Sequence, residues 1–236
     1  MIENVIATHE LPLGIATNFV VNGKPVLVPM VIEEPSVVAA ASNAAKMAGN
    51  FEASSDEPVM IGQVLLVRVK NFSAAKKKIL AAKKRLLEMA NARDSVLVKF
   101  GGGAKNIEVR EAKFKAAKMM VIHLLVDVRD AMGANAVNTM CETIAPELEQ
   151  LSGGIARMRI ISNLAVHRKA RAKAVWKKEI IGEATVDAVL DAYAFAASDK
   201  FRCATHNKGI MNGIDAVVLA TGNDFRAVEA GAHAYA

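Results

Sequence analysis

The chain has 236 residues, of which 53% are hydrophobic and only 5% aromatic, and its formal net charge is +6. This length can bury a sizeable core in one large domain or two small ones, and the apolar fraction excludes a disordered chain. Two cysteines exclude a disulfide framework and favour a reduced, cytoplasmic protein, while the longest apolar run, 119–126, is too short to cross a bilayer.

The first 58 residues predict short strands followed by one helix. Asn22-Gly23 lies between two apolar runs, which is the strongest short-range signal for a hairpin, here over 19–28. An Ala- and Val-rich segment without internal Pro or Gly predicts a helix over 36–47. The polar stretch 52–58 is typical of a linker.

The next hundred residues alternate between strand and helix patterns. We expect a strand at 64–69, a helix at 73–92, strands at 107–110 and 119–128, a helix at 133–151 and a strand at 157–160. The first helix has apolar residues at spacings of three and four, namely Phe72, Ala75, Ile79, Ala82, Leu86 and Ala90. Pro146 can kink or split the second helix. The βαββαβ order predicts a ferredoxin-like domain at 61–163.

Helical patterns continue from residue 164 to the end of the chain. We expect helices at 186–197, 209–220 and 225–236. The fold class is therefore α+β, with the ferredoxin-like domain inserted into a larger, helix-rich, discontinuous domain formed by 1–60 and 164–236. The last helix has no Gly, Pro or capping residue after it, so we expect a truncated chain.

The segment Asp127-Val-Arg-Asp-Ala-Met-Gly-Ala-Asn135 joins an expected buried strand to an expected helix. A glycine at a helix start lets a ligand approach the free N–H groups, and the helix dipole favours an anion such as pyrophosphate. On spacing alone, an ordinary turn with Asp130 as the helix cap is the more frequent explanation. Neither this segment nor 101–103 matches G-x-G-x-x-G, which disfavours a Rossmann site.

Three charged residues lie at expected helix starts, namely Glu34, Lys208 and Asp224. Each alone fits a structural role: an acidic helix entry, a solvated lysine and an N-cap. Lysine at a helix start opposes the dipole, which slightly favours a functional role. Together they supply two carboxyl groups and an ammonium group, as a site that polarises and protonates a carbonyl oxygen requires.

Two basic clusters, 76–85 and 168–178, leave nucleic-acid binding open as a rival function. Solvated helix faces explain them better, because no recognised binding motif accompanies them and aromatic residues for stacking are few. We therefore expect no nucleic-acid partner. The five histidines and two cysteines show no metal-ligand spacing, so we expect no metal.

Taken together, these segments resemble class II 3-hydroxy-3-methylglutaryl-coenzyme A (HMG-CoA) reductases. The resemblance covers essentially the whole chain, in the family's order, and lies in the segments 3–6, 31–40, 127–135, Thr205-His-Asn-Lys-Gly-Ile-Met-Asn-Gly-Ile-Asp215 and Ala220-Thr-Gly-Asn-Asp-Phe-Arg-Ala-Val-Glu-Ala-Gly-Ala-His233. It implies an NAD(P)H-dependent, two-step reduction of HMG-CoA to mevalonate and coenzyme A, or the reverse. It also implies a cytoplasmic homodimer or higher homo-oligomer whose ferredoxin-like domain binds the cofactor.

The resemblance implies roles for individual residues. Lys208 would polarise the thioester and later the aldehyde carbonyl, Asp224 would hydrogen-bond that lysine, and Glu34 would assist proton transfer. Further substrate contacts are implied for Ser36, Asn163, Arg202 and Asn212. The residues implied to bind the cofactor are Asp94, Asp130, Met132, Gly133 and Asn135. Because Asp94 would lie near the adenosine ribose, where a carboxylate accepts from a 2′-hydroxyl and repels a 2′-phosphate, we expect NADH to be preferred over NADPH.

The chain departs from the family at both ends. Family members have an N-terminal segment that contributes to dimerisation, and a mobile C-terminal segment with a histidine that protonates coenzyme A. Neither matches any part of this chain. We therefore expect the central portion of the enzyme, without measurable HMG-CoA reduction by itself. A catalytically incomplete fragment that binds a nucleotide or acyl-coenzyme A remains the alternative.

Overall fold

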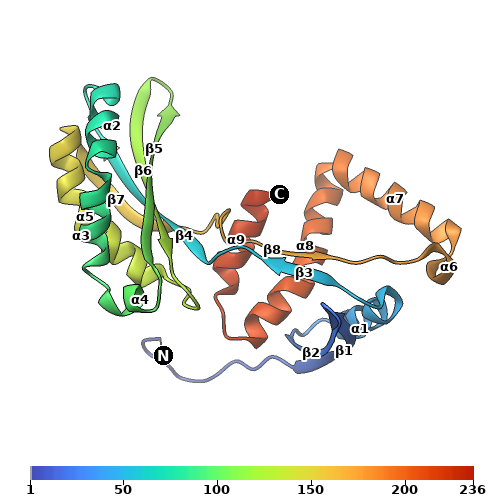
Figure 1. The fold of residues 1–236 in the computed structure, drawn as a ribbon. Helices are drawn as coiled ribbons and strands as arrows, with labels where there is room; N and C mark the ends of the chain where they lie inside the picture. Colours follow the sequence, from blue (N-terminus) through green and yellow to red (C-terminus); the bar gives the residue numbers. More distant parts are fainter. Residues whose placement is uncertain (1) are drawn as a thin grey trace. The chain divides into compact units, whose positions relative to one another are not determined.

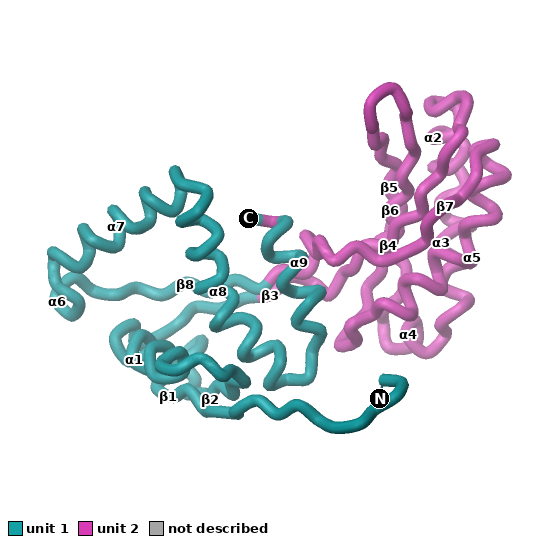
Figure 2. The backbone as a smooth tube through the Cα atoms, turned by 180° about the vertical axis from the view of Figure 1, so that it is seen from behind, with its two compact units in different colours: residues 1–54, 170–234, 236 teal, residues 55–169, 235 magenta. Residues whose placement is uncertain are grey.

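The computed structural model describes residues 2–236, which divide into two compact units (Figures 1 and 2). Unit 1 contains the chain up to Ser54, Ala170–Ala234 and Ala236, and unit 2 contains Ser55–Lys169 and Tyr235. The junctions expected from the sequence, 60/61 and 163/164, lie inside unit 2. The difference arises because Val59 and Met60 already belong to a sheet strand, and Ala165 still packs against the core of unit 2.

Unit 2 has the elements of the expected βαββαβ order. They are β4 (Val59–Val67), α2 (Phe72–Ala81), α3 (Lys83–Asn91), α4 (Ser95–Lys99), β5 (Gly103–Phe114), β6 (Ala117–Asp127), α5 (Ala134–Ser152) and β7 (Ile155–Ser162). The strands form one antiparallel sheet in the order β5-β6-β4-β7. This is the strand order of a ferredoxin-like domain, so the predicted fold class is confirmed.

The core of unit 2 lies between this sheet and the helices α2, α3 and α5 (Figure 1). Alternate residues of β6 face the helices and are fully buried, namely Met120, Ile122, Leu124 and Val126. Gly62 in β4 lies beneath α5, where a Cβ would overlap Cys141 and Val137, so only glycine permits this close approach.

One local expectation for unit 2 was wrong in detail. The helix expected at 73–92 is interrupted at Ala82 (φ −86°, ψ 3°), although every residue of its predicted apolar stripe packs into the core. No Pro or Gly marks this break in the sequence. By contrast, α5 continues through Pro146 without splitting.

Unit 1 begins with the predicted hairpin. Strands β1 (Leu13–Val21) and β2 (Lys24–Val31) pair antiparallel, and the turn residues Asn22 (φ 50°) and Gly23 (φ 76°) both have the left-handed backbone that this tight turn requires. Helix α1 (Val37–Ala48) follows, close to its predicted position.

The rest of unit 1 combines one further strand pair with four helices, counted over the described residues. Its elements are β3 (Glu52–Ser55), β8 (Ala170–Lys173), α6 (Lys178–Ile181), α7 (Glu183–Ser198), α8 (Lys200–Ala220) and α9 (Phe225–Tyr235). The expectation of a linker at 52–58 was partly wrong, because β3 pairs with β8. Polar side chains concealed that strand, whose partner lies more than a hundred residues away in the sequence.

Among the helices, α8 departs most from its expected start. It begins at Lys200 rather than at residue 209, and Asp199 caps it by accepting a hydrogen bond from the backbone N–H of Arg202 (2.7 Å). Lys208 therefore lies in the middle of a 21-residue helix, and the expected helix start at which a lysine would oppose the dipole is not present there. Gly209 and Gly213 lie inside the helix, where a glycine is easily mistaken for a boundary.

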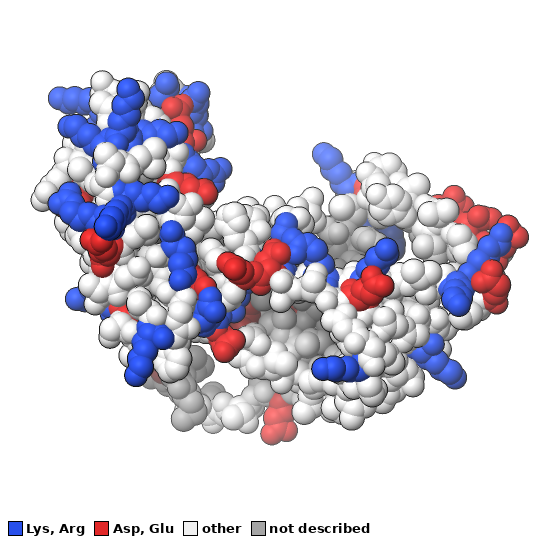
Figure 3. All heavy atoms as spheres, in the orientation of Figure 1, with Lys and Arg blue, Asp and Glu red and all other residues white. Residues whose placement is uncertain are grey.

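Over residues 2–236, no helix is long and apolar enough to span a membrane. The same residues contain no group of three or more His, Cys, Asp or Glu side chains placed to hold a metal ion. Lys and Arg side chains gather at the end of unit 2 that carries α2 and the β5–β6 hairpin (Figure 3). In the first basic cluster the lysines of α2 are exposed, and Arg85 pairs with Glu147, as expected of solvated helix faces.

Candidate functional site

The first candidate site lies within unit 1, where α8 faces the segment that follows β2. A cavity of about 280 Å³ opens there. Its lining combines apolar side chains with a concentration of charged ones, namely Leu11, Val31, Ile32, Glu33, Glu34, Lys208, Met211, Asn212, Asp215, Ala216, Leu219, Glu229 and His233. Three of the residues proposed from the sequence are among them: Glu34, Lys208 and Asn212.

These three residues form one hydrogen-bonded group. The Nζ of Lys208 donates to Oε2 of Glu34 (2.5 Å), and Nδ2 of Asn212 donates to the same oxygen (3.2 Å). Lys208 and Asn212 are one turn apart on α8, so both side chains reach the same carboxylate. The side chains of Lys208 and Glu34 remain 61% and 43% exposed, so a ligand can reach the ammonium group.

The hydrogen bond and the charge of Lys208 hold the pKa of Glu34 below its ordinary value. Glu34 therefore stays ionised at neutral pH, and the stabilisation from the pair is lost only as the pH falls through the lowered pKa. Replacing Lys208 with methionine is expected to raise the pKa of Glu34, as measured by a carboxyl-carbon NMR titration of glutamate-labelled protein. The control is Lys200→Met, which replaces an exposed lysine of α8 and should leave the pKa of Glu34 unaltered. An unshifted pKa of Glu34 in Lys208→Met would contradict the ion pair.

Asp215 lines the same cavity, although no pattern in the sequence predicted it there. Its Oδ1 is buried without a hydrogen-bond partner. Burial raises the pKa of Asp215, the charge of Glu229 raises it further, and His233 acts in the opposite direction. Residues 208, 212 and 215 lie on one face of a helix because of their spacing. The sequence did not reveal this face, because the helix was expected to begin only at residue 209.

The expected hydrogen bond between Asp224 and Lys208 is absent from the structure. Asp224 caps α9 instead, accepting from the N–H of Ala227 (3.2 Å) and pairing with Arg226 (3.2 Å). This is the simple structural role that its position before a helix also allowed.

The remaining predicted substrate residues lie outside this cavity. Ser36 is the exposed N-cap residue of α1, and Arg202 lies in the first turn of α8. Asn163 belongs to unit 2, where it is exposed just after β7. Within unit 1, the structure therefore brings Asn212, but not Ser36 or Arg202, together with Lys208.

The second candidate site lies within unit 2, at the start of α5. A cavity of about 560 Å³ is lined there by Arg93, Asp94, Ala131, Met132, Gly133, Ala134, Asn135, Ala136 and Thr139. Four of the five residues proposed for the cofactor are in this lining. Asp130, the fifth, is exposed and is not part of the lining.

The start of α5 suits a phosphate group. Gly133 has a φ of 91°, and a Cβ there would overlap Val128, so the position requires glycine. No side chain caps the helix, which rules out Asp130 as the cap. The N–H groups of the first turn have no intrahelical acceptors and line a cavity, which is the usual arrangement for binding an anion at a helix start.

Asp94 lies at the same cavity but also has a structural role. It caps α4, and its Oδ1 accepts a hydrogen bond from the N–H of Leu97 (2.8 Å). Arg93 lies beside it in the cavity lining. The ribose-binding role expected for Asp94 thus depends on the second carboxylate oxygen.

Unit 2 is thus a ferredoxin-like domain with a cavity suited to a phosphate-bearing ligand. Comparison with known proteins identifies the family: the hydroxymethylglutaryl-coenzyme A reductase family model matches residues 1–236. The chain belongs to this family.

Relatives and solved structures agree with this assignment. The 3-hydroxy-3-methylglutaryl-coenzyme A reductase of Archaeoglobus fulgidus is 60% identical over the whole chain, and a probable reductase of Borreliella burgdorferi is 33% identical. The chain spans 55% and 56% of their lengths, about half of each relative. A reductase structure from Streptococcus pneumoniae has a TM-score of 0.95 at 44% identity, covering 99% of this chain and 65% of its own. A class II reductase structure from the same organism, bound to NADPH in open conformations, has a TM-score of 0.91 at 44% identity, covering 99% and 58%.

Proposed function

We propose that this chain carries out, as part of an HMG-CoA reductase, the NAD(P)H-dependent two-step reduction of HMG-CoA to mevalonate and coenzyme A, or the reverse. The observation that carries the proposal is the Lys208–Glu34–Asn212 group at a cavity in unit 1. Family membership supports it.

Lys208 is the group best suited to stabilise charge on a reacting oxygen. Its ammonium group is held in place by Glu34 yet remains accessible. Both reduction steps place negative charge on a carbonyl oxygen, and an ammonium group fixed beforehand next to that oxygen lowers the barrier of each step. Glu34 can orient the ammonium and exchange a proton with it, and Asn212 holds the carboxylate in position.

The residues around the start of α5 fit a nicotinamide dinucleotide. The uncapped N–H groups suit its pyrophosphate, while Asp94 and Arg93 lie where an adenosine ribose could be recognised. When bound, this cofactor supplies the hydride. Unit 2 contributes binding and orientation, and Met132 and Asn135 complete the cavity wall.

The direct test follows NAD(P)H absorbance during incubation of the complete reductase, of which this chain is a part, with HMG-CoA and identifies mevalonate as the product. Ligand binding is measured separately by calorimetry. Mevalonate formation that requires Lys208 supports the proposal. Tight binding of both ligands without turnover would favour the alternative, a binding fragment that is catalytically incomplete.

We propose that the cofactor preferred is NADH. The negative charge of Asp94 repels a 2′-phosphate, whereas its second oxygen can accept from a 2′-hydroxyl. Asp94→Asn keeps a capping oxygen for α4 but removes the charge, so it should strengthen NADPH binding and change NADH binding little. Fluorescence titration of both cofactors measures this effect. Tighter binding of NADPH than NADH by the wild type would contradict the preference.

We also propose that the working form is a cytoplasmic homodimer or higher homo-oligomer. Unit 1 exposes large apolar side chains, including Leu27, Leu190, Tyr193 and Phe201, at 60% or more of their surface. Exposed apolar groups of this kind are typical of surfaces covered by another subunit. Both cysteines are free thiols, as expected in a reducing compartment. Sedimentation equilibrium tests the assembly, and a monomer at micromolar concentration would contradict it.

A further inference from the structure

The β6–α5 loop, residues 128–133, supplies three residues of the cavity lining in unit 2, namely Ala131, Met132 and Gly133. It is exposed over 129–132 and contains no regular secondary structure. Its own backbone supplies one turn, in which the N–H of Ala131 donates to the carbonyl of Val128 (3.1 Å). Since the start of α5 can bind an anion only if this loop leaves the N–H groups accessible, the contacts that hold the loop matter for binding.

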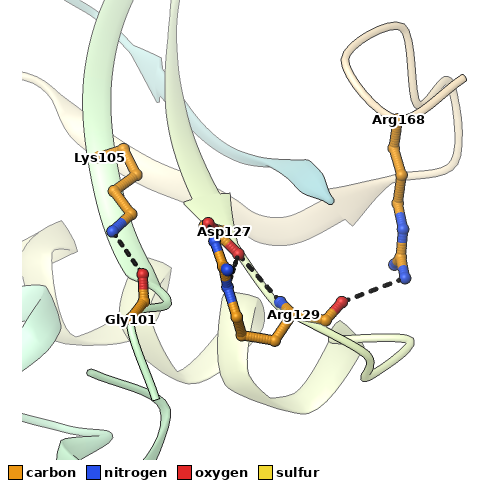
Figure 4. Close-up of polar contacts among 5 residues, drawn as sticks. All are labelled: Gly101, Lys105, Asp127, Arg129 and Arg168. Carbon is orange, nitrogen blue, oxygen red and sulfur yellow. Dashed lines mark hydrogen bonds and ion pairs between the residues drawn. The ribbon is translucent and has the colours of Figure 1, made fainter. Parts of the chain in front are cut away.

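At its beginning, the loop is held by a buried carboxylate. Asp127, at the end of β6, is 2% exposed. Its carboxylate accepts from the backbone N–H (3.0 Å) and Nε (2.7 Å) of Arg129, and its other oxygen pairs with the guanidinium. Arg129 has a φ of 51°, so the chain turns sharply there and the side chain folds back onto Asp127 (Figure 4). The charge of Arg129 is therefore already paired with Asp127 at the end of β6.

Further along, the loop is held from outside by Arg168. This residue lies in the segment after β7, in the same unit, and its guanidinium extends to two loop carbonyls. Nη1 donates to the carbonyl oxygen of Ala131 (3.0 Å) and Nη2 to that of Arg129 (3.4 Å), the latter drawn in Figure 4. A planar guanidinium can bridge two acceptors in a fixed geometry, whereas a lysine ammonium would act as a flexible point charge.

We propose that Arg168 is a positioning residue of the nucleotide site, holding the β6–α5 loop so that the start of α5 stays open to the cofactor phosphates. This inference rests on the proposed function of unit 2. It also gives a role to a residue of the second basic cluster that the reductase chemistry leaves unexplained. Arg168 contacts loop carbonyls rather than lining the cavity, so it acts through the loop and not on the cofactor directly.

The test compares NADH binding by the wild type, Arg168→Ala, Arg168→Lys and the control Lys113→Ala, using fluorescence titration of the 236-residue chain. Lys113 is an exposed cation near the hairpin end of β5, opposite the end of the sheet at Asp127. Arg168→Ala should raise the dissociation constant about tenfold. Arg168→Lys should recover only a minor part of that loss, and Lys113→Ala should change binding less than about twofold, because its charge is distant and screened.

Two further measurements distinguish a positioning role of Arg168 from an effect of its charge and from a loss of global stability. Amide exchange over 129–135 should be faster in Arg168→Ala without ligand, while the melting temperature stays near that of the wild type. The loss of affinity should also persist at high salt, where a purely electrostatic effect is screened.

The outcomes distinguish this inference from the proposed function. If the wild type binds neither NADH nor NADPH, the proposed function of unit 2 fails. If the wild type binds but Arg168→Ala binds equally well, only the role of Arg168 is wrong. Full recovery by Arg168→Lys would also overturn it, because a positive charge alone would then suffice.

Discussion

In the complete reductase of which this chain is a part, replacing Lys208 with alanine is expected to lower the rate of HMG-CoA reduction by about two orders of magnitude, equivalent to roughly 3 kcal/mol of barrier stabilisation. Its Nζ donates a hydrogen bond to Oε2 of Glu34 (2.5 Å), which fixes the position of the ammonium group. From that position the ammonium group would act mainly on the charge that develops in the transition state. Binding of HMG-CoA should therefore change much less than turnover. Steady-state kinetics with HMG-CoA and with mevaldehyde measures both steps, and each should be impaired.

The matched control for this experiment is Lys200→Ala. Lys200 is an exposed lysine at the start of the same helix, so its loss should alter stability by only a few tenths of a kcal/mol and leave turnover intact. A folded Lys208→Ala variant with near-normal turnover would remove Lys208 from the mechanism. Glu34→Gln provides a further comparison, because it keeps a hydrogen-bond acceptor for Lys208 but removes the charge.

Replacing Ile122 with alanine is expected to destabilise unit 2 by about 3 kcal/mol and lower its melting temperature by roughly 10 °C or more. Ile122 is fully buried in the middle of β6, between the sheet and the helices. Truncation removes its apolar contacts and leaves a cavity that close-packed neighbours fill only in part.

Val121 provides the control on the same strand. It lies on the opposite face of the sheet and is only half-buried, so Val121→Ala should cost clearly less stability than Ile122→Ala. Thermal unfolding followed by circular dichroism compares the two variants. Equal losses would show that the helix-covered face is not the main core of unit 2.

The ferredoxin-like unit could be predicted because its signals are local and agree with one another. The apolar stripe from Phe72 to Ala90 and the continuous run in β6 specify which faces are buried, and the βαββαβ order then leaves few topologies. The Asn22-Gly23 turn is equally local, since its backbone conformation favours those two residue types. By contrast, β3 was missed because its pairing with β8 depends on a distant segment.

The candidate sites also contain some residues that could be predicted from the sequence and others that could not. Motif resemblance was enough to select Glu34, Lys208 and Asn212 as a group, and the residues at the start of α5 as another. It also placed Asp224 beside Lys208, whereas the structure uses that carboxylate as a helix cap. Asp215 went unnoticed because its place in the cavity follows from the true start of α8.

The family, the fold class, the hairpin and the residue types available for chemistry could all be predicted without a structure. These follow from periodicity, turn chemistry and motifs, all of which act over short stretches of chain. Three features became evident only in the folded chain: Lys208 lies mid-helix against Glu34, an oxygen of Asp215 is buried without a partner, and Arg168 contacts the β6–α5 loop. Each of these joins groups that are far apart in sequence or depends on burial, and such contacts form only when packing brings the segments together.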